Sequence, residues 1–409
     1  MSVRPLSSAN RPESTFTVVP PDKRAHAQQI FDLVALQWRD DLGRHCRDGR
    51  INYSHYDWNT SRVGVIGDNI VTHYGVYDTT IRVGSSRVRA AGVNLVVTHP
   101  DHRKQGLMPK TIWASIEAMR SRGYDISIVA NAVESYYERF GYVVAWPEVH
   151  YFVRTEDLPT ERPTARLRTF NTRHRPIMAD LYNAENANVT GTAVRPTFLR
   201  TKEPGDLQGY LMLDHQSNIT GYIIYDVVSR GSAVWHYDSA GDPEERLRIF
   251  GQIARRLDAE EVRFNRLPFS TTLASRLRLR SCYSESKYVQ SGGWMIQIIN
   301  LRTLFEKLAA ELSARLARSS MARWSGDLRI STRNESITLT IESGHITVGP
   351  SMDSEHSIEG GEEIALLVMG TEAPHETTTA AATRLTGDAA CLIEVLFPSQ
   401  SPQMGNADL

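Results

Sequence analysis

The chain has 409 residues, which is too long for one ordinary hydrophobic core and predicts two or three domains. Its formal net charge is -1 and 23% of its residues are charged, a balance that gives no support to a nucleic-acid-binding protein, which usually carries a basic excess. No apolar run approaches the roughly 18 residues of a membrane span, and the polar N-terminus lacks the apolar core of a signal peptide. The three cysteines, Cys46, Cys282 and Cys391, are far apart and odd in number, so we expect neither a metal cluster nor a disulfide framework, and a reducing cytoplasm as the setting.

Strands and helices are mixed along the first part of the chain. The pattern predicts a strand at 16–21, an amphipathic helix within 22–46, and a meander of three strands across 61–100. A turn at 99–106 then leads into a helix that continues to about residue 122. A strand at 124–131 and a short helix with a final strand at 135–145 complete the unit. This order predicts an α/β or α+β class with a partly parallel sheet.

The same pattern restarts at about residue 160. A strand at 165–171, a helix at 173–187, a second meander within 209–241, a helix at 243–257, a strand at 262–268 and a helix at 270–280 follow each other. The two halves therefore look like divergent copies of one unit. The second copy has HYDSAGDPEE where the first has HPDHRKQGLM, so acids replace the cations of the turn.

A third, smaller α+β domain is expected from about residue 299. It combines an amphipathic helix at 301–316, two or three alternating strands across 327–350, and a helix within 361–371. The predicted domains are residues 1–155, 156–298 and 299–409.

The turn that follows the first meander combines three features that suit an anion. The start of a helix carries unpaired N–H groups and partial positive charge. Gly106 lets the backbone approach a ligand closely, and Arg103 and Lys104 add formal positive charge. Together they form a site suited to a pyrophosphate, although an ordinary basic strand-to-helix turn is the alternative. The spacing fits neither a P-loop nor a dinucleotide-binding fingerprint.

Two motifs, in order, resemble those of the GNAT superfamily of N-acetyltransferases. V-x-x-P-x-x-R-x-x-G after a strand meander resembles the pyrophosphate motif Q/R-x-x-G-x-G/A, with Arg103, Gly106 and Met108 at its named positions. Met108 departs from the small residue that usually stands last. Further on, NAVESYYERFGY resembles the Asn of the family followed by Tyr-x-Lys/Arg-x-Gly-Phe/Tyr.

The resemblance implies acetyl-CoA as the donor and needs no metal. Main-chain N–H groups around Val96, Val97 and Thr98 would bond the pantetheine arm, and Asn131 would reach it from the next strand. The pyrophosphate would be held by the turn, that is by Arg103, Lys104, Gln105, Gly106, Leu107, Met108 and Pro109.

In the same resemblance Tyr137 is the general acid that protonates the departing thiolate. A tyrosine can serve because the leaving group is comparably basic. The alternative is that Tyr136 and Tyr137 only pack beneath the acyl chain.

The whole arrangement resembles the enhanced intracellular survival (Eis) family, which implies α/β (α+β) tandem GNAT folds with mixed central sheets plus a C-terminal sterol-carrier-like α+β domain. Members assemble as hexamers and acetylate amines on aminoglycosides or lysine side chains, so we expect a small-molecule or peptide amine substrate, a homo-oligomer, and neither a nucleic-acid nor a membrane partner.

The general base is the open problem, because residues 82–100 contain no Asp or Glu. The Eis resemblance assigns the base to the carboxylate of the last residue, here Leu409, with Asp408 as a neighbouring acid. Leu409 is unlike the aromatic residue expected at the end of that family, and a frayed terminus is the alternative. His99 and His102, beside the turn, are further candidates.

The acceptor pocket is poorly specified. Asp40 and Asp41 could attract a polycationic amine, although a solvated helix end is the simpler interpretation. A competing function is a lipid- or hydrophobe-binding protein that works through the third domain. An inactive second unit that builds an oligomer is compatible with the acetyltransferase.

Overall fold

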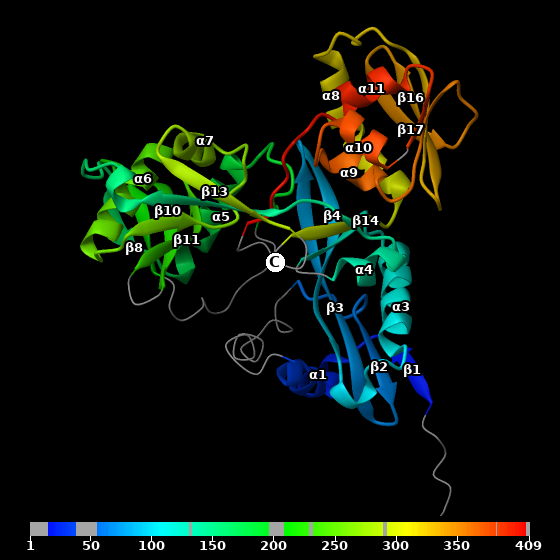
Figure 1. Cartoon of the computed structure of the whole chain (residues 1–409), viewed down its shortest axis with the longest axis horizontal. Helices are drawn as coiled ribbons and strands as arrows, with labels where there is room; N and C mark the ends of the chain where they lie inside the picture. The colour runs from blue at the N-terminus through cyan, green and yellow to red at the C-terminus, as the bar shows by residue number, and fades with distance from the viewer. Residues whose placement is uncertain are drawn as a thin grey trace, which may run out of the picture. The chain divides into compact units, whose positions relative to one another are not determined.

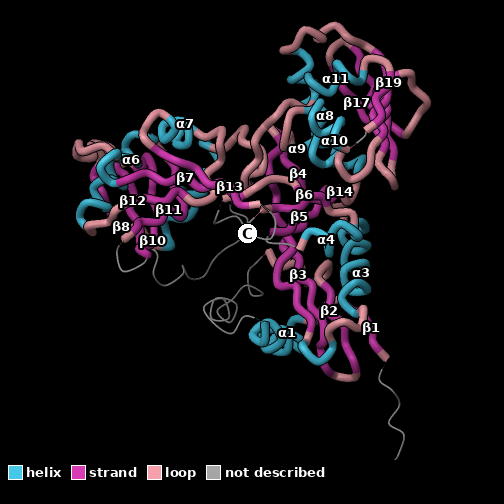
Figure 2. Tube along the Cα trace, in the orientation of Figure 1, coloured by secondary structure: helices cyan, strands magenta, loops and turns pink. Residues whose placement is uncertain are grey.

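The computed structural model describes residues 15–37, 55–130, 133–195, 208–228, 232–288, 293–381 and 383–405. The chain divides into two compact units. The first takes in residues 1–52, 56–76 and 93–122, and the second takes in residues 53–55, 77–92 and 123–409. Figure 1 labels the helices and strands, and Figure 2 distinguishes them by colour.

The first unit holds the start of the predicted meander and the helix after the turn. Its elements are β1 (Phe16–Val19), α1 (Lys23–Gln37), β2 (Arg62–Ile66), the first part of β3 (Asn69–Val83), the last part of β4 (Ser86–Thr98), and α3 (Leu107–Ser121). The predicted strands and the helix after the turn are confirmed. Two hydroxyl contacts hold α3 against this unit: Thr111 Oγ1 lies 2.7 Å from Thr72 Oγ1 of β3, and Ser115 donates to the carbonyl of Thr60, in the turn before β2, at 2.9 Å.

One seven-stranded sheet contains these strands in the order β1-β2-β3-β4-β5-β14-β6, with β5 at Ile126–Ala130, β14 at Trp294–Ile298 and β6 at Val143–Val144. β14 pairs antiparallel with both β5 and β6. The predicted second domain includes residues 294–298. In the structure these residues instead belong to the first sheet, which also holds β1 to β5.

The second sheet, in turn, contains a strand from the predicted first domain. Its order is β13-β7-β12-β11-β10-β9-β8, and β7 (Glu148–Arg154), which the sequence grouped with the first domain, pairs with β12 and β13. The remaining elements are β8 (Arg166–Thr169), α5 (Arg175–Glu185), β9 (Gln208–Leu213), β10 (Ile219–Val228), β11 (Ala233–Ala240), α6 (Pro243–Arg256), β12 (Glu261–Phe264), α7 (Thr272–Arg278) and β13 (Cys282–Lys287). The second meander and its helices are confirmed, and β13 is a strand that the sequence analysis did not identify.

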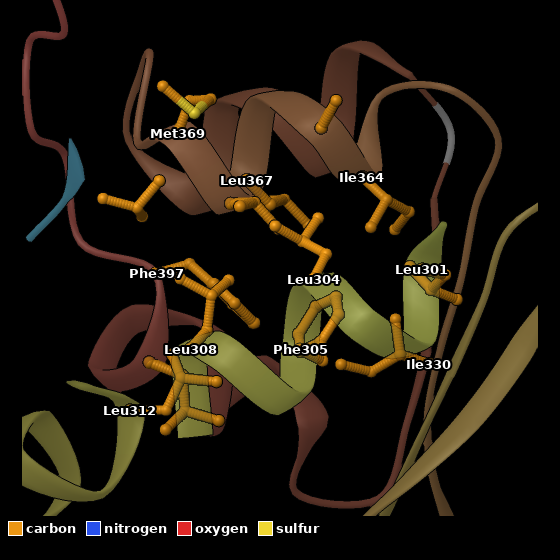
Figure 3. Packing of buried hydrophobic residues seen from close by; sticks show 14 of the residues in the cluster. Leu301, Leu304, Phe305, Leu308, Leu312, Ile330, Ile364, Leu367, Met369 and Phe397 are labelled. Carbon is orange, nitrogen blue, oxygen red and sulfur yellow. The ribbon is translucent and has the colours of Figure 1, made fainter. Parts of the chain in front are cut away.

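The third sheet has the order β17-β16-β15-β18-β19. Its strands are β15 (Gly326–Ser331), β16 (Ser336–Glu342), β17 (His345–Pro350), β18 (His356–Glu359) and β19 (Arg384–Thr386), and its helices are α8 (Leu301–Ala317), α9 (Ile364–Met369), α10 (Pro374–Ala380) and α11 (Ala389–Leu396). Figure 3 shows leucines of α8 meeting Leu367 and Phe397 in the interior, which these side chains occupy.

The turn between β3 and β4 is joined to this third sheet's long helix. Glu311 of α8 accepts from the main-chain N–H of Ser85 at 3.1 Å and from its hydroxyl at 2.5 Å, and it accepts from Arg315 at 2.8 Å. Apolar residues of β3, β4 and α8 belong to one cluster of buried side chains, so α8 packs against this part of the first sheet. Among the described residues there is no helix with the length and apolar content to cross a membrane.

Candidate functional site

The predicted phosphate turn begins where β4 ends. His99 N–H still bonds to the carbonyl of Val71 at 2.8 Å, and Pro100–His102 then form a single 3₁₀ turn. Gly106 caps α3 with a left-handed backbone (φ 71°) and supplies no side-chain hydrogen bond to the helix start. The first N–H groups of α3 therefore face outward without a capping side chain, which is the arrangement that binds an anion.

Both cations of the turn are exposed at this helix start. Arg103 donates from Nη2 to Gln37 Oε1 at 2.6 Å and from Nε to the carbonyl of Thr98 at 3.3 Å. Lys104 adopts a left-handed backbone (φ 60°), and Gln105 donates to the carbonyl of Asp101 at 3.1 Å. The arrangement adds two formal positive charges to the partial charge of the helix.

The departure at Met108 has a packing reason. Leu107 and Met108 are both buried, at 8% and 7% exposure, and belong to the face of α3 that meets the strands. Met108 therefore fills the core instead of the outer surface of the turn. Pro109 has no N–H, so that position contributes shape and no hydrogen bond.

Val96, Val97 and Thr98 are the last residues of β4, directly before the turn. Val97 is buried, whereas Val96 and Thr98 are half-buried. The first unit thus holds, in one continuous stretch, the strand end predicted to bind pantetheine and the turn predicted to bind pyrophosphate.

Tyr137 lies in the second unit, at the end of the short helix α4 (Glu134–Tyr137). Its ring makes edge contacts with Tyr136 at 5.4 Å and with Tyr142 at 5.6 Å, measured between ring centroids. Tyr142 in turn bonds to Ser127 of β5 at 2.6 Å, which fixes this aromatic group to the sheet. Burial raises the pKa of Tyr137 above its ordinary value, so the phenol keeps its proton at neutral pH.

Tyr136 has a different environment. It is half-buried, and the guanidinium of Arg139 lies 4.1 Å from the centre of its ring. This cation–π contact gives Tyr136 a packing role, which makes it a suitable control for its neighbour.

The C-terminal segment is held as far as the structure describes it. Gln400 N–H donates to the carbonyl of Gly370 at 2.7 Å, and Gln403 N–H donates to that of Thr190 at 3.3 Å. Gln403 and Met404 are 1% and 0% exposed. The sequence analysis offered a frayed terminus as the alternative, and residues 400–405 do not have that character. No local pattern in this polar segment signals such an anchor, because the partners lie far away in the chain.

Several predicted residues lie outside the described part of the chain. They are Asp40, Asp41, Asn131, Asp408 and Leu409. The two histidine candidates are described: His99 Nδ1 accepts from the N–H of Asp101 at 3.3 Å, and its ring lies 5.7 Å from that of His102.

In the second copy of the fold, α6 corresponds to α3 but begins differently. Asp242 caps α6 and accepts from the N–H of Glu245 at 2.8 Å, with Glu244 and Glu245 in the first turn. Negative charge and a filled cap oppose an anion there. His236, in the preceding strand, is buried and bonds to Ser239 at 2.9 Å, and burial lowers its pKa to about 3.

The chain is similar to known acetyltransferases in part of its sequence and in its fold. Residues 23–145 match the model of the acetyltransferase (GNAT) domain. The chain is similar to the solved structure of a GCN5-related N-acetyltransferase from Anabaena variabilis, with 18% identity, a TM-score of 0.77, and coverage of 95% of this chain and 99% of that one. No curated protein matches the chain in sequence.

Two further solved structures share the arrangement. A probable N-acyltransferase from Enterococcus faecalis has 16% identity and a TM-score of 0.74, and covers 96% of this chain and 99% of its own. Eis1 from Mycobacterium abscessus has 14% identity and a TM-score of 0.68, and covers 97% of this chain and 100% of its own. At these identities the likeness shows the fold, and it confirms the predicted class of mixed α/β sheets in tandem with an additional C-terminal domain.

Proposed function

We propose that this chain is an acyltransferase that uses acetyl-CoA to acetylate a primary amine on an aminoglycoside, a polyamine or a lysine side chain, because residues 23–145 match the model of the acetyltransferase (GNAT) domain. The observation that carries the proposal is the uncapped start of α3 behind Gly106, with Arg103 and Lys104 beside it. Phosphate oxygens would accept from the exposed N–H groups and pair with the two cations. The N–H groups of residues 96–98 would bond the pantetheine amides in the manner of an added strand, and Asn131 is proposed to join them.

Transfer by direct attack needs one acid and one base. The amine nitrogen forms a bond to the thioester carbonyl carbon, and the carbon–sulfur bond then breaks. Tyr137 would give its proton to the departing sulfur, for which its raised pKa keeps it protonated. The amine must lose a proton to a base.

We assign the base to the terminal carboxylate of Leu409, with Asp408 contributing to substrate affinity. The support is the anchored segment before it: residues 400–405 are bound to Gly370 and Thr190, so the chain end starts from a fixed point. His99 and His102 are the remaining candidates for the base.

We further propose that the protein is a cytoplasmic homo-oligomer, a hexamer, and that the second copy of the fold in each chain serves to assemble it. Light scattering at micromolar concentration tests the assembly, and a monomer would exclude it.

The alternative function, binding of a lipid in the third domain, gains no support from the packing. Leu304, Phe305 and Leu308 of α8 meet Leu367 of α9 in the interior shown in Figure 3, where an apolar ligand would have to displace them. Saturable binding of a fluorescent sterol, with no calorimetric signal for CoA, would reverse this ranking.

The deciding experiment mixes the purified chain with acetyl-CoA and a panel of amines and follows thiol release with a chromogenic reagent. Amine-dependent release is expected. The same assay on protein ending at Ala407 should show that release lost while CoA still binds. Full activity after truncation would move the base to His99, His102 or a water relay. If CoA binds but none of the amines in the panel causes thiol release, the proposed acceptor class is contradicted.

A further inference from the structure

Leu95, inside β4, has a backbone conformation that strands do not use. Its φ is 54°, in the left-handed region, although it is a branched residue that is only 3% exposed. Such a conformation is unfavourable for an L-residue with a Cβ and persists only where its surroundings hold it. The position therefore needs an explanation in its contacts.

Side chains bond both main-chain groups of Leu95. Its N–H donates to the side-chain oxygen of Asn94 at 2.8 Å, and its carbonyl oxygen lies 2.6 Å from Nδ1 of His73, on β3. Two polar side chains are thus committed to this one residue. A left-handed residue inside a strand turns the chain locally and so changes the direction of the main-chain groups that follow it.

The hydrogen positions on His73 follow from its two partners. A carbonyl oxygen can only accept, so Nδ1 carries the hydrogen and Nε2 carries the lone pair. Nε2 lies 2.7 Å from the hydroxyl of Tyr56, which must then be the donor. Burial lowers the pKa of His73 to about 4, so the ring is neutral in the physiological range and this tautomer persists.

Gly75 permits the close approach that the arrangement needs. A Cβ at this position would stand 2.7 Å from the carbonyl oxygen of Asn94 and 2.9 Å from Cε1 of His73. β3 therefore supplies, two residues apart, the histidine that bonds to Leu95 and the glycine that leaves room for the Asn94 carbonyl.

The residues directly after Leu95 are Val96, Val97 and Thr98, the proposed pantetheine-binding strand end. We propose that His73, supported by Tyr56, is a positioning residue that holds Leu95 in its left-handed conformation and thereby aims the next main-chain N–H groups at the acyl donor. This inference rests on the proposed function. It means that His73, a buried residue that does not touch the donor, influences donor binding through Leu95.

Two variants of His73 separate this role from general packing. His73→Asn keeps an N–H near the position of Nδ1 and can still donate to Leu95, whereas His73→Gln carries its amide near the position of Nε2 and favours Tyr56. Both remove an aromatic ring from the same buried place, so their melting temperatures should fall together. Calorimetric titration with CoA should give His73→Asn an affinity within about twofold of the wild type and His73→Gln one about tenfold weaker, the factor expected when one hydrogen bond is lost.

Kinetics give the second readout. His73→Gln should raise the KM for acetyl-CoA about tenfold while leaving the KM for the amine unchanged. Equal CoA affinities in the two variants, or losses that follow only the melting temperature, would overturn the inference. Wild-type protein that failed to bind CoA would instead overturn the proposed function, so the two failures are distinguishable.

Discussion

The main-chain nitrogen of Gln403 lies so close to Gly191 that a Cβ added to the glycine would stand 2.7 Å from it. Gly191 has a φ of 89°, in the region that favours glycine. Both facts restrict the residue at position 191 to glycine, and Met404, which follows Gln403, is fully buried. The last described residues of the chain are therefore seated against a backbone that tolerates no side chain.

Gly191→Ala should detach the C-terminal segment. The substituted residue carries about 1–2 kcal/mol of backbone strain and also pushes against main-chain atoms that cannot rotate away. We expect a rate of amine-dependent thiol release close to that of the truncated protein, and faster proteolysis of the C-terminus. The two are measured on the same preparation.

Gly344→Ala is the matched control for this substitution. Gly344 has a φ of 80°, but nothing lies within 4 Å of an added Cβ. It carries the backbone strain without the steric contact, so it should lower stability less than Gly191→Ala does and leave thiol release unchanged. Equal activity in the two variants would show that the seat at Gly191 does not matter for catalysis.

Arg103→Glu should weaken CoA binding about tenfold at low salt. The substitution replaces attraction to the pyrophosphate with repulsion at an exposed position, where the effect is screened by ions. The wild-type affinity should therefore depend more strongly on salt than that of the variant. Calorimetry at two ionic strengths measures both quantities. Arg120→Glu, in the last turn of α3, makes the same charge change away from the turn and should leave CoA affinity intact. Loss of affinity in both variants would count against a local phosphate site.

Tyr137→Phe should reduce kcat about a hundredfold, because the departing sulfur loses its proton donor. CoA affinity should hardly change, since the ring and its contacts with Tyr136 and Tyr142 remain. Tyr136→Phe removes a neighbouring hydroxyl and should retain most of the rate. A drop in CoA affinity as large as the drop in rate would assign Tyr137 to packing.

Acid should destabilise the fold before the carboxylates are protonated. Burial lowers the folded-state pKa of His236 to about 3 and that of His73 to about 4, against about 6.5 in the unfolded chain. Between these values the unfolded state binds more protons, so stability is full above pH 6.5 and falls as the pH decreases. At the acid limit the lowered pKa of His73 corresponds to roughly 3 kcal/mol and that of His236 to roughly 5 kcal/mol.

Urea unfolding at pH 7.5 and at pH 5.0 measures this difference. His236→Gln should make the free energy of unfolding less dependent on pH across that window. An unchanged slope in His236→Gln would mean that this ring is not the titrating group.

The turn at 99–106 could be predicted because its signal is local. A glycine after two cations, at a strand-to-helix boundary, determines both the backbone and the charge of that short segment. The consequence of Met108 could not be predicted, since its burial depends on the strands against which α3 packs. The relation of Leu95 to His73 is also invisible in sequence, because it depends on the register of β3 beside β4.

The two exchanged strands illustrate the same limit at larger scale. The sequence analysis predicted no strand at 294–298 or at 149–153, and nothing in either segment identifies the strand with which it pairs. A composition change marks where one pattern stops, whereas hydrogen bonding decides which sheet a strand joins. The boundaries at 155/156 and 298/299, which were drawn from the pattern alone, therefore do not indicate which sheet β7 and β14 join.

The place of β14 between β5 and β6 has a consequence for biosynthesis. While the ribosome is still translating the second copy of the fold, β5 and β6 have been made but the strand between them has not. For that interval they expose unpaired strand edges and apolar faces to solvent, a state that is prone to aggregation. A gene fragment that stops after residue 155 leaves the chain in that state permanently. A fragment that keeps the whole first sheet must therefore extend through residue 298.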